Sequence, residues 1–332
     1  MENEYFKGFL GNETALLQLS SAVKTGRASH CYMFCGEKGL GKHTLAKMFA
    51  KALMCENEDK PCNKCKSCIQ IENEDHPDVI YIRHEKPTLF SVDEIRDFSK
   101  QMYIRPYTSD RKIFILKDAQ LLNVQAQNAA LKTIEEPPEY GMILLLTDNK
   151  EAFLPTILSR CTEVALQPLS DELVSRGLKD AGIEDAYITD DLLKRAAGNL
   201  GMAKRLLTDE VLMEKTMAQQ RCLEELCDMT GEQIWNEAVR LGAEKEDLPM
   251  LFSMMRTWFS DLAKCKAGYT RSATPAMRRI SEKYDLSDFP RIFEAIDTAE
   301  KQRKVNVSPE LAAELMLIKC RPKKNEIYEI QK

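Results

Sequence analysis

The sequence predicts an α/β domain with a parallel sheet, followed by regions built only of helices. In the first half, short apolar runs rich in β-branched and aromatic residues alternate with helical patterns, which is typical of a parallel sheet covered by helices. From about Pro168 these runs are absent and helical periodicity continues. The 332 residues are enough for two or three domains, each with its own core.

Five apolar runs are predicted to be strands. They are short and nearly continuous in apolar residues, as expected for parallel strands that are covered on both faces. The predicted strands are Cys31–Cys35, Val79–Ile82, Lys112–Leu116, Met142–Thr147 and Thr162–Leu166.

Helical patterns fill the intervals around these strands. Ser91 and Glu94 have the spacing of a capping box, and Pro137-Pro138 ends the fourth helix because proline cannot extend it. The predicted helices are Glu13–Val23, Lys42–Leu53, Val92–Met102, Val124–Ile134 and Pro155–Leu158.

Three short helices are predicted after Pro168, at Asp171–Lys179, Asp190–Ala197 and Leu200–Leu207, with Gly198-Asn199 as a cap or tight turn between the last two.

Residues 209–332 are predicted to be wholly helical. Trp235 and Trp258 lie on helical patterns and are expected in the core of a helix bundle. Ser308-Pro309-Glu310 has the features of a helix start, with serine as the N-cap, proline in the first turn and an acid near the positive end of the dipole.

The composition is that of an ordinary globular protein, with a net charge of −5 from 47 basic and 52 acidic residues. The charges are spread evenly, whereas a protein that binds DNA on its own usually has a basic excess. No 18-residue apolar run is present and the N-terminus lacks the layout of a signal peptide, so we expect a cytoplasmic protein without a membrane span. The 11 cysteines are then expected as thiols rather than disulfides.

Residues 36–44 nearly form a phosphate-binding loop, because Gly36, Gly41 and Lys42 fit the pattern G-x-x-x-x-G-K-[ST] between a predicted strand and a predicted helix. Backbone N–H groups of such a loop and the helix N-terminus cradle phosphates. His43 replaces the hydroxyl residue that holds Mg²⁺, and imidazole is a poor ligand for this hard cation. The pattern indicates an NTPase framework without a competent NTPase centre.

A second departure lies at the end of the strand Lys112–Leu116, which continues into Lys117-Asp118. A working centre places two acids there, one for Mg²⁺ and one to orient water. Lys117 instead puts a positive charge at the metal position, and Asp118 is either a residual base or an acid in a surface turn. The candidate residues of this degenerate nucleotide site are Gly36, Gly39, Gly41, Lys42, His43, Thr44 and Asp118.

Four cysteines, Cys55, Cys62, Cys65 and Cys68, lie within 14 residues. Thiolates at this spacing favour a closed, tetrahedral and structural Zn²⁺ site. An iron–sulfur cluster is the alternative, but a ferredoxin-type run needs another cysteine at position 72, which is Glu72.

The stretch from Gln127 to Pro138, with Ile143–Thr147 and the segment from Leu154 to Cys161, strongly resembles the bacterial clamp-loader subunits of DNA polymerase III, the AAA+ family of gamma/tau and delta-prime. The resemblance covers residues 1–208 well. It implies a RecA-like AAA+ domain at 1–167 with a zinc module at 55–68, a helical lid at 168–208 and a helical collar for oligomerisation at 209–332.

The departures from the family's ATPases favour a subunit of the delta-prime type. Gly201 stands where the resemblance implies a lid arginine, so that the hydroxyl, the acidic pair and the arginine are all missing. By the same resemblance, Arg160 in Ser159-Arg160-Cys161 is an arginine finger that acts in trans on a neighbouring subunit's ATP. The implied partners are gamma/tau and delta and, through the complex, the sliding clamp and primer–template DNA.

Two alternatives stay open. One is a gamma/tau-like ATPase with weak activity that uses Thr44 in place of the missing hydroxyl, one position late. The other is a zinc-containing DNA-binding scaffold outside replication. Whether ATP binds the loop is also open.

Overall fold

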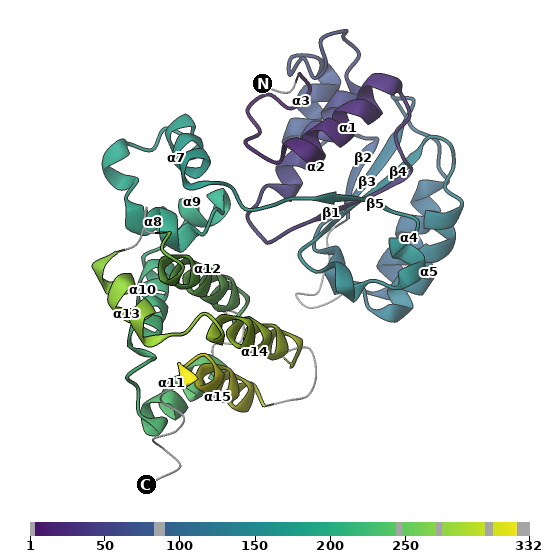
Figure 1. Ribbon diagram of the computed structural model, residues 1–332. Helices are drawn as coiled ribbons and strands as arrows, with labels where there is room; N and C mark the ends of the chain where they lie inside the picture. The colour runs from purple at the N-terminus through teal and green to yellow at the C-terminus, as the bar shows by residue number, and fades with distance from the viewer. Residues whose placement is uncertain (1–3, 83–89, 244–247, 270–273, 303–307, 324–332) are drawn as a thin grey trace. The chain divides into compact units, whose positions relative to one another are not determined.

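The computed structural model describes residues 4–82, 90–243, 248–269, 274–302 and 308–323 (Figure 1). The chain divides into two compact units. The first is Met1–Thr189 with Gly198–Lys204, and the second is Asp190–Ala197 with Arg205–Lys332. Each unit is described by itself.

The first unit contains a five-stranded parallel sheet in the order β2-β3-β4-β1-β5. The predicted parallel sheet is therefore confirmed, and each predicted strand agrees with the observed one to within one residue at either end. The strands are β1 (Cys31–Cys35), β2 (Val79–Ile82), β3 (Lys112–Leu116), β4 (Gly141–Thr147) and β5 (Thr162–Ala165).

Helices cover both faces of this sheet (Figure 1). Successive side chains of a strand point to opposite faces. Ile113 and Ile115 of β3 therefore lie in the core with α1 (Glu13–Thr25) and α2 (Lys42–Met54). Phe114 and Leu116 lie in a second core with α4 (Val92–Met102) and α5 (Val124–Glu135).

The capping signals act as the sequence predicts. Ser91 and Glu94 form the reciprocal capping box of α4, and α5 ends at Glu135, before Pro137-Pro138. A helix missing from the sequence prediction, α3 (Lys66–Asn73), begins inside the cysteine-rich segment. The remaining helices of this unit are α6 (Pro155–Leu158), α7 (Asp171–Asp180) and the short 3₁₀ turns at Ala119–Leu121, Lys150–Ala152 and Asp185–Tyr187.

The second unit is all-helical in the residues described. Its core is formed by buried side chains from successive helices, among them Phe252, Met255 and Phe259. The helices are α8 (Asp190–Ala196), α9 (Leu200–Thr208, whose first turns belong to the first unit), α10 (Glu210–Glu225), α11 (Gly231–Ala243), α12 (Leu248–Lys266), α13 (Pro275–Lys283), α14 (Asp288–Gln302) and α15 (Pro309–Lys319).

The two tryptophans differ from each other. Trp258 of α12 is partly buried against the core, as predicted. The prediction for Trp235 is wrong, because this side chain is 46% exposed. Helix α11 packs through Ile234, Ala238 and Leu241, so position 235 lies about 100° round the helix from that stripe.

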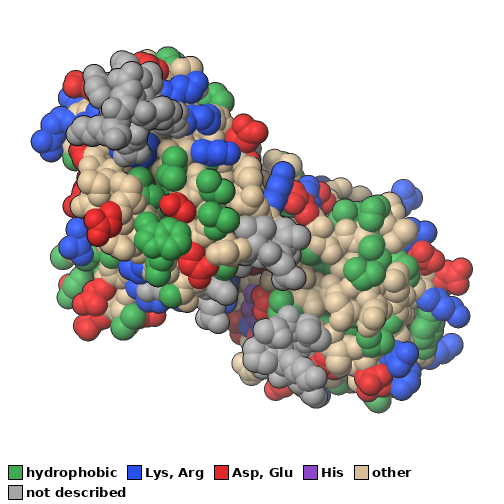
Figure 2. Space-filling model, turned by 90° about the horizontal axis from the view of Figure 1, so that it is seen from below, with side chains coloured by type: hydrophobic (Ala, Val, Ile, Leu, Met, Phe, Trp, Pro, Cys, Tyr) green, Lys and Arg blue, Asp and Glu red, His purple; other side chains and the backbone are tan. Residues whose placement is uncertain are grey.

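Basic and acidic side chains are interspersed on the face drawn in Figure 2, and its described part has no continuous basic stripe. None of the helices in the described ranges is both long enough and apolar enough to span a bilayer.

Candidate nucleotide and metal sites

The phosphate-loop pattern lies between β1 and α2, as predicted. Gly41 precedes the helix with φ of +93°, a conformation that side chains with a Cβ rarely adopt. Its carbonyl accepts the first bond of α2, from Leu45 N at 2.9 Å. The loop therefore ends at the N-terminus of a 13-residue helix, the usual place for a bound phosphate.

The loop lysine is bonded to its own loop. Lys42 Nζ donates to the carbonyl oxygens of Gly36 at 2.5 Å and of Glu37 at 2.9 Å. Burial lowers the pKa of Lys42, while the negative charges of Asp148 and Asp118 oppose that shift. The negative charges of nearby carboxylates thus stabilise the ammonium group of Lys42. A phosphate must compete with the two carbonyl groups for this ammonium group.

A cavity of about 470 Å³ opens beside the loop, within the first unit. Its size is in the range of small-molecule sites. Gly39, Gly41 and Thr44 line one side, and the N-terminal segment and α7 contribute Phe9 and Gly177.

The start of α9 contacts the loop directly. Asn199 Nδ2 donates to Lys38 O at 2.8 Å, and Gly201 N donates to Gly39 O at 3.2 Å. A Cβ at position 201 would lie 2.6 Å from Gly39 O, so a larger residue, such as the lid arginine implied by the resemblance, would require the two backbone segments to move apart.

The two residues that replace the magnesium ligands lie on either side of one carboxylate. His43 Nε2 is 3.1 Å from Glu74 Oε1, and Lys117 Nζ is 3.3 Å and 3.4 Å from the two Glu74 oxygens. Lys117 also lies over the Tyr81 ring, 5.2 Å from its centroid. The two motif positions at which magnesium ligands are expected thus carry basic side chains that contact the same acid.

Asp118 occupies the turn after β3. It is exposed, has a φ of +53° and precedes the 3₁₀ turn Ala119–Leu121. Its charge acts on Lys42. Both interpretations of Asp118, the surface-turn acid and the residual base, are therefore compatible with its position.

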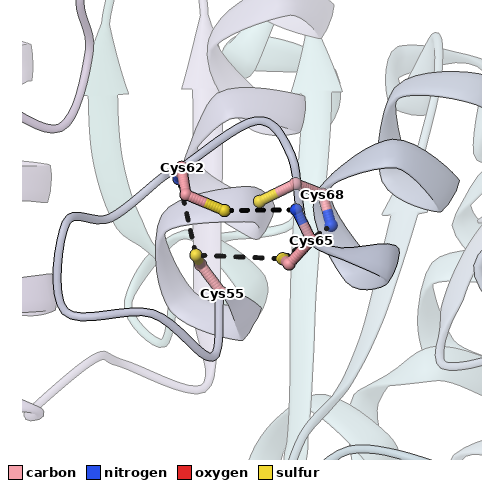
Figure 3. Close-up of side chains that lie close together, drawn as sticks. All are labelled: Cys55, Cys62, Cys65 and Cys68. Carbon is pink, nitrogen blue, oxygen red and sulfur yellow. Dashed lines mark hydrogen bonds between the residues drawn. The ribbon is translucent and has the colours of Figure 1, made fainter.

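The four cysteines converge (Figure 3). Their sulfur atoms lie within 4.8 Å of one another, and the Sγ atoms of Cys55 and Cys65 are 4.0 Å apart. Four ligands at a Zn–S distance of about 2.3 Å in a tetrahedron have S···S separations of about 3.8 Å, so the observed cluster fits a metal.

Backbone N–H groups also favour thiolates in this cluster. Lys64 N and Cys65 N both point at Cys62 Sγ, and together they lower the pKa of Cys62 to about 6. Burial has the opposite effect on Cys68 and raises its pKa. Cys65 is the N-cap of α3, its Sγ accepting from Cys68 N at 3.4 Å, so the sulfur cluster and this helix form one local structure.

Arg160 follows α6 on the surface of the first unit. Its guanidinium donates to Thr156 O at 2.8 Å and pairs with Glu135 Oε1 at 3.0 Å. The two side chains of this pair are 38% and 39% exposed. Ser159 Oγ, 3.3 Å from the guanidinium, helps to position it, and Cys161 packs its sulfur against that of Cys31 in β1.

Sequence reasoning missed Glu74, Asp148 and the role of Asn199. Glu74 lies in a generally acidic stretch and has no motif around it, so nothing in the sequence points to its contacts with residues 43 and 117. Asp148 directly follows β4, and the carboxyl end of a strand next to β1 is a signal that was available.

Residues 11–170 match the family model described as "DNA polymerase III, delta subunit". The DNA polymerase III subunit gamma of Buchnera aphidicola subsp. Acyrthosiphon pisum is 34% identical over 197 residues, covering 58% of this chain and 54% of the relative. Subunit tau of Escherichia coli K12 is 27% identical over 345 residues, covering 95% and 53%. The chain spans about half the length of these relatives.

Among solved structures, a gamma-subunit-related protein of Thermotoga maritima is similar over 91% of this chain and 98% of its own, with 18% identity and a TM-score of 0.37. By sequence, residues 11–170 are similar to the delta-type domain of DNA polymerase III, and the chain is similar to gamma and tau subunits of that polymerase. The architecture of the predicted fold class is confirmed, with a five-stranded parallel sheet between helices and a helical C-terminal region.

Proposed function

We propose that this chain is a clamp-loader subunit of the delta-prime type, a catalytically silent AAA+ partner that supplies Arg160 to the ATP site of a neighbouring subunit. Its residues 1–167 act as the AAA+ domain, 168–208 as the lid and 209–332 as the collar. Its partners are gamma/tau and delta subunits and, through the assembled complex, the sliding clamp and primer–template DNA.

The observation that carries this proposal is the replacement of both magnesium ligands by basic side chains around Glu74. Magnesium takes oxygen ligands. His43 offers a nitrogen, and Lys117 offers only donors. Without the metal, the charge that develops on a transferred phosphoryl group has no counter-ion, so hydrolysis at this site is not expected.

Arg160 is suited to the role in trans. It is partly exposed and its pair with Glu135 lies on the surface. Such exposed pairs are worth only about 0–1 kcal/mol. A triphosphate presented by a neighbouring subunit offers several bidentate contacts to a guanidinium, which is enough to displace Glu135.

The four cysteines are proposed to hold one structural Zn²⁺. The sulfur cluster is compact, includes no further His or Asp ligand among the described residues and leaves no open position for substrate. When bound, the metal would hold the segment 55–68 against α3.

Reconstitution tests the proposal. The chain is mixed with gamma/tau and delta, and DNA-stimulated ATPase and clamp loading are measured for native protein, Arg160→Ala and Arg176→Ala. Arg176 is a matched control, an exposed arginine that is also paired with a carboxylate. We expect Arg160→Ala to assemble normally and to lower ATP hydrolysis, by up to about 10³-fold at the site that it completes.

Equal ATPase rates for Arg160→Ala and Arg176→Ala would show that Arg160 does not act as an arginine finger. If gamma/tau and delta assemble with each other but do not bind this chain, the proposed role in assembly is wrong as well.

A gamma-like ATPase is the second candidate, favoured by the homology to gamma and tau and by the position of Thr44 at the cavity. The isolated chain decides between the two: magnesium-dependent turnover above that of Lys42→Ala supports the ATPase. The alternative of a DNA-binding scaffold has no support from the interspersed charges in Figure 2.

A further inference from the structure

The carboxylate of Glu74 stands between the two side chains at the magnesium-ligand positions. It is 3.1 Å from His43 Nε2 and 3.3 Å from Lys117 Nζ, and its side chain is only 19% exposed. Lys47 Nζ lies 3.9 Å from the same oxygen. Three basic groups from α2 and the end of β3 thus converge on one acid.

This arrangement inverts the charges of a magnesium site. In a working site a cation is held between oxygen ligands, whereas here an anion is held between nitrogen donors. Lys117 and Lys47 repel a divalent cation at this place and attract an anion. Phosphate groups of a nucleotide bound at the loop would be drawn to the same donors that Glu74 already engages.

Helix α3 brings Glu74 to this place. The helix runs from Lys66 to Asn73, and Glu74 follows it as the C-cap, with a φ of +61° that is unusual for a residue with a Cβ. Its neighbour Glu72 anchors the same turn, because Lys47 Nζ donates to the Glu72 carbonyl at 2.8 Å and Lys51 pairs with its carboxylate. The chain therefore holds Glu74 in a costly conformation at the end of a fixed helix.

We propose that Glu74 is an internal anion that fills the inverted magnesium position and competes with the phosphates of a nucleotide for His43 and Lys117. Glu74 then lowers the affinity of this site for nucleotides, because it occupies the donors that phosphates would use. The surrounding lysines repel Mg²⁺. The inference rests on the proposed silent role of the site, and its test uses the isolated chain without any partner subunit.

The test compares the native chain, Glu74→Gln and Asp75→Asn for binding of a fluorescent ATP analogue in magnesium-free buffer without chelator. Asp75→Asn is the matched control, since it removes an exposed acid directly next to Glu74 in the chain. We expect Glu74→Gln to bind about tenfold more tightly, the size of one charged hydrogen bond. Added Mg²⁺ should not tighten that binding.

Equal affinity for all three proteins, or tighter binding by the native chain on addition of Mg²⁺, overturns the proposal. If Glu74→Gln fails to fold, Lys117→Asp decides. It places a second carboxylate beside Glu74 and His43, so Mn²⁺ should raise the melting temperature of Lys117→Asp and not that of native protein. No shift in either protein also overturns the proposal. Neither result bears on Arg160, so failure here leaves the assembly role standing.

Discussion

Asp78 is a fully buried carboxylate that organises a loop of the first unit. It precedes β2 and accepts hydrogen bonds from Tyr107 N, Thr108 N and Ser109 N at 2.6, 2.8 and 3.0 Å. Burial acts to raise its pKa, but these N–H donors outweigh burial and hold the pKa of Asp78 below its usual value. Hydrogen bonds, most of them from backbone N–H groups, thus stabilise the negative charge of Asp78.

We expect Asp78→Asn to lower the free energy of unfolding by about 1–3 kcal/mol, because the amide turns an NH₂ group toward backbone donors. A carboxyl group with a depressed native pKa contributes stability that is present above its unfolded pKa of about 3.9 and lost as pH falls through the native pKa. The difference between native and variant should therefore be constant at neutral pH and shrink below about pH 4.

Urea unfolding across this pH range is the measurement, with Asp97→Asn as the control. Asp97 is exposed and pairs with Lys100 on the surface, so Asp97→Asn should change stability little. An equal loss for both variants, or a difference that persists in acid, would contradict this account of Asp78.

At the scale of elements, the sequence predicts those helices and strands whose apolar residues follow a clear pattern. Strand β3 was predictable because four successive apolar residues, Ile113–Leu116, are bounded by polar ones and buried on both faces. Helix α3 was missed because its eight residues include a metal-type cysteine, and its two long apolar side chains, Ile69 and Ile71, are two positions apart, so the helical periodicity is weak. The cysteine cluster itself was predictable, since its ligands are close in sequence.

Helix α3 gives a prediction for metal removal. An eight-residue helix is too short to be stable alone. We expect the protein to carry one zinc and no visible absorption, and removal of the metal to speed amide exchange across Lys66–Asn73, because Cys65 and Cys68 fix the first turn. Hydrogen exchange by mass spectrometry, with metal content measured in parallel, is the experiment.

Helix α1 serves as the internal reference, because it lies outside the cysteine segment and packs on the sheet core. Exchange in α3 that is unchanged after verified loss of metal would show that the helix does not depend on the site. A visible chromophore in the loaded protein would indicate an iron–sulfur cluster instead.

At the scale of the molecule, the sequence predicted individual residues of the nucleotide site but not the contacts between them. His43 and Lys117 were recognised from local patterns, whereas Glu74 joins them only through the fold, 31 and 43 residues away along the chain. The prediction that Trp235 lies in the core was wrong for a related reason. A helical pattern places a residue on a helix, but the face that is buried depends on which neighbour packs there.

Exposed apolar side chains on α11 and α15 bear on assembly. Trp235 and Val239 of α11 are exposed, and so are Leu311 and Leu315 of α15, a helix that packs against α11. Large exposed apolar groups mark interfaces, and tryptophan is enriched among residues that dominate binding energy. In the proposed complex, we expect these exposed side chains of the second unit to contact a neighbouring subunit.

We therefore expect Trp235→Ala to weaken assembly with gamma/tau and delta by about tenfold or more, corresponding to at least about 1.4 kcal/mol. Its exposed side chain contributes little to the folded monomer, so the melting temperature of the isolated chain should stay nearly constant. Sedimentation of mixed subunits measures assembly, and Tyr269→Ala, another exposed aromatic of the second unit, is the control. If Trp235→Ala assembles as well as Tyr269→Ala, the collar contacts lie elsewhere; if it lowers the melting temperature, the tryptophan belongs to the fold after all.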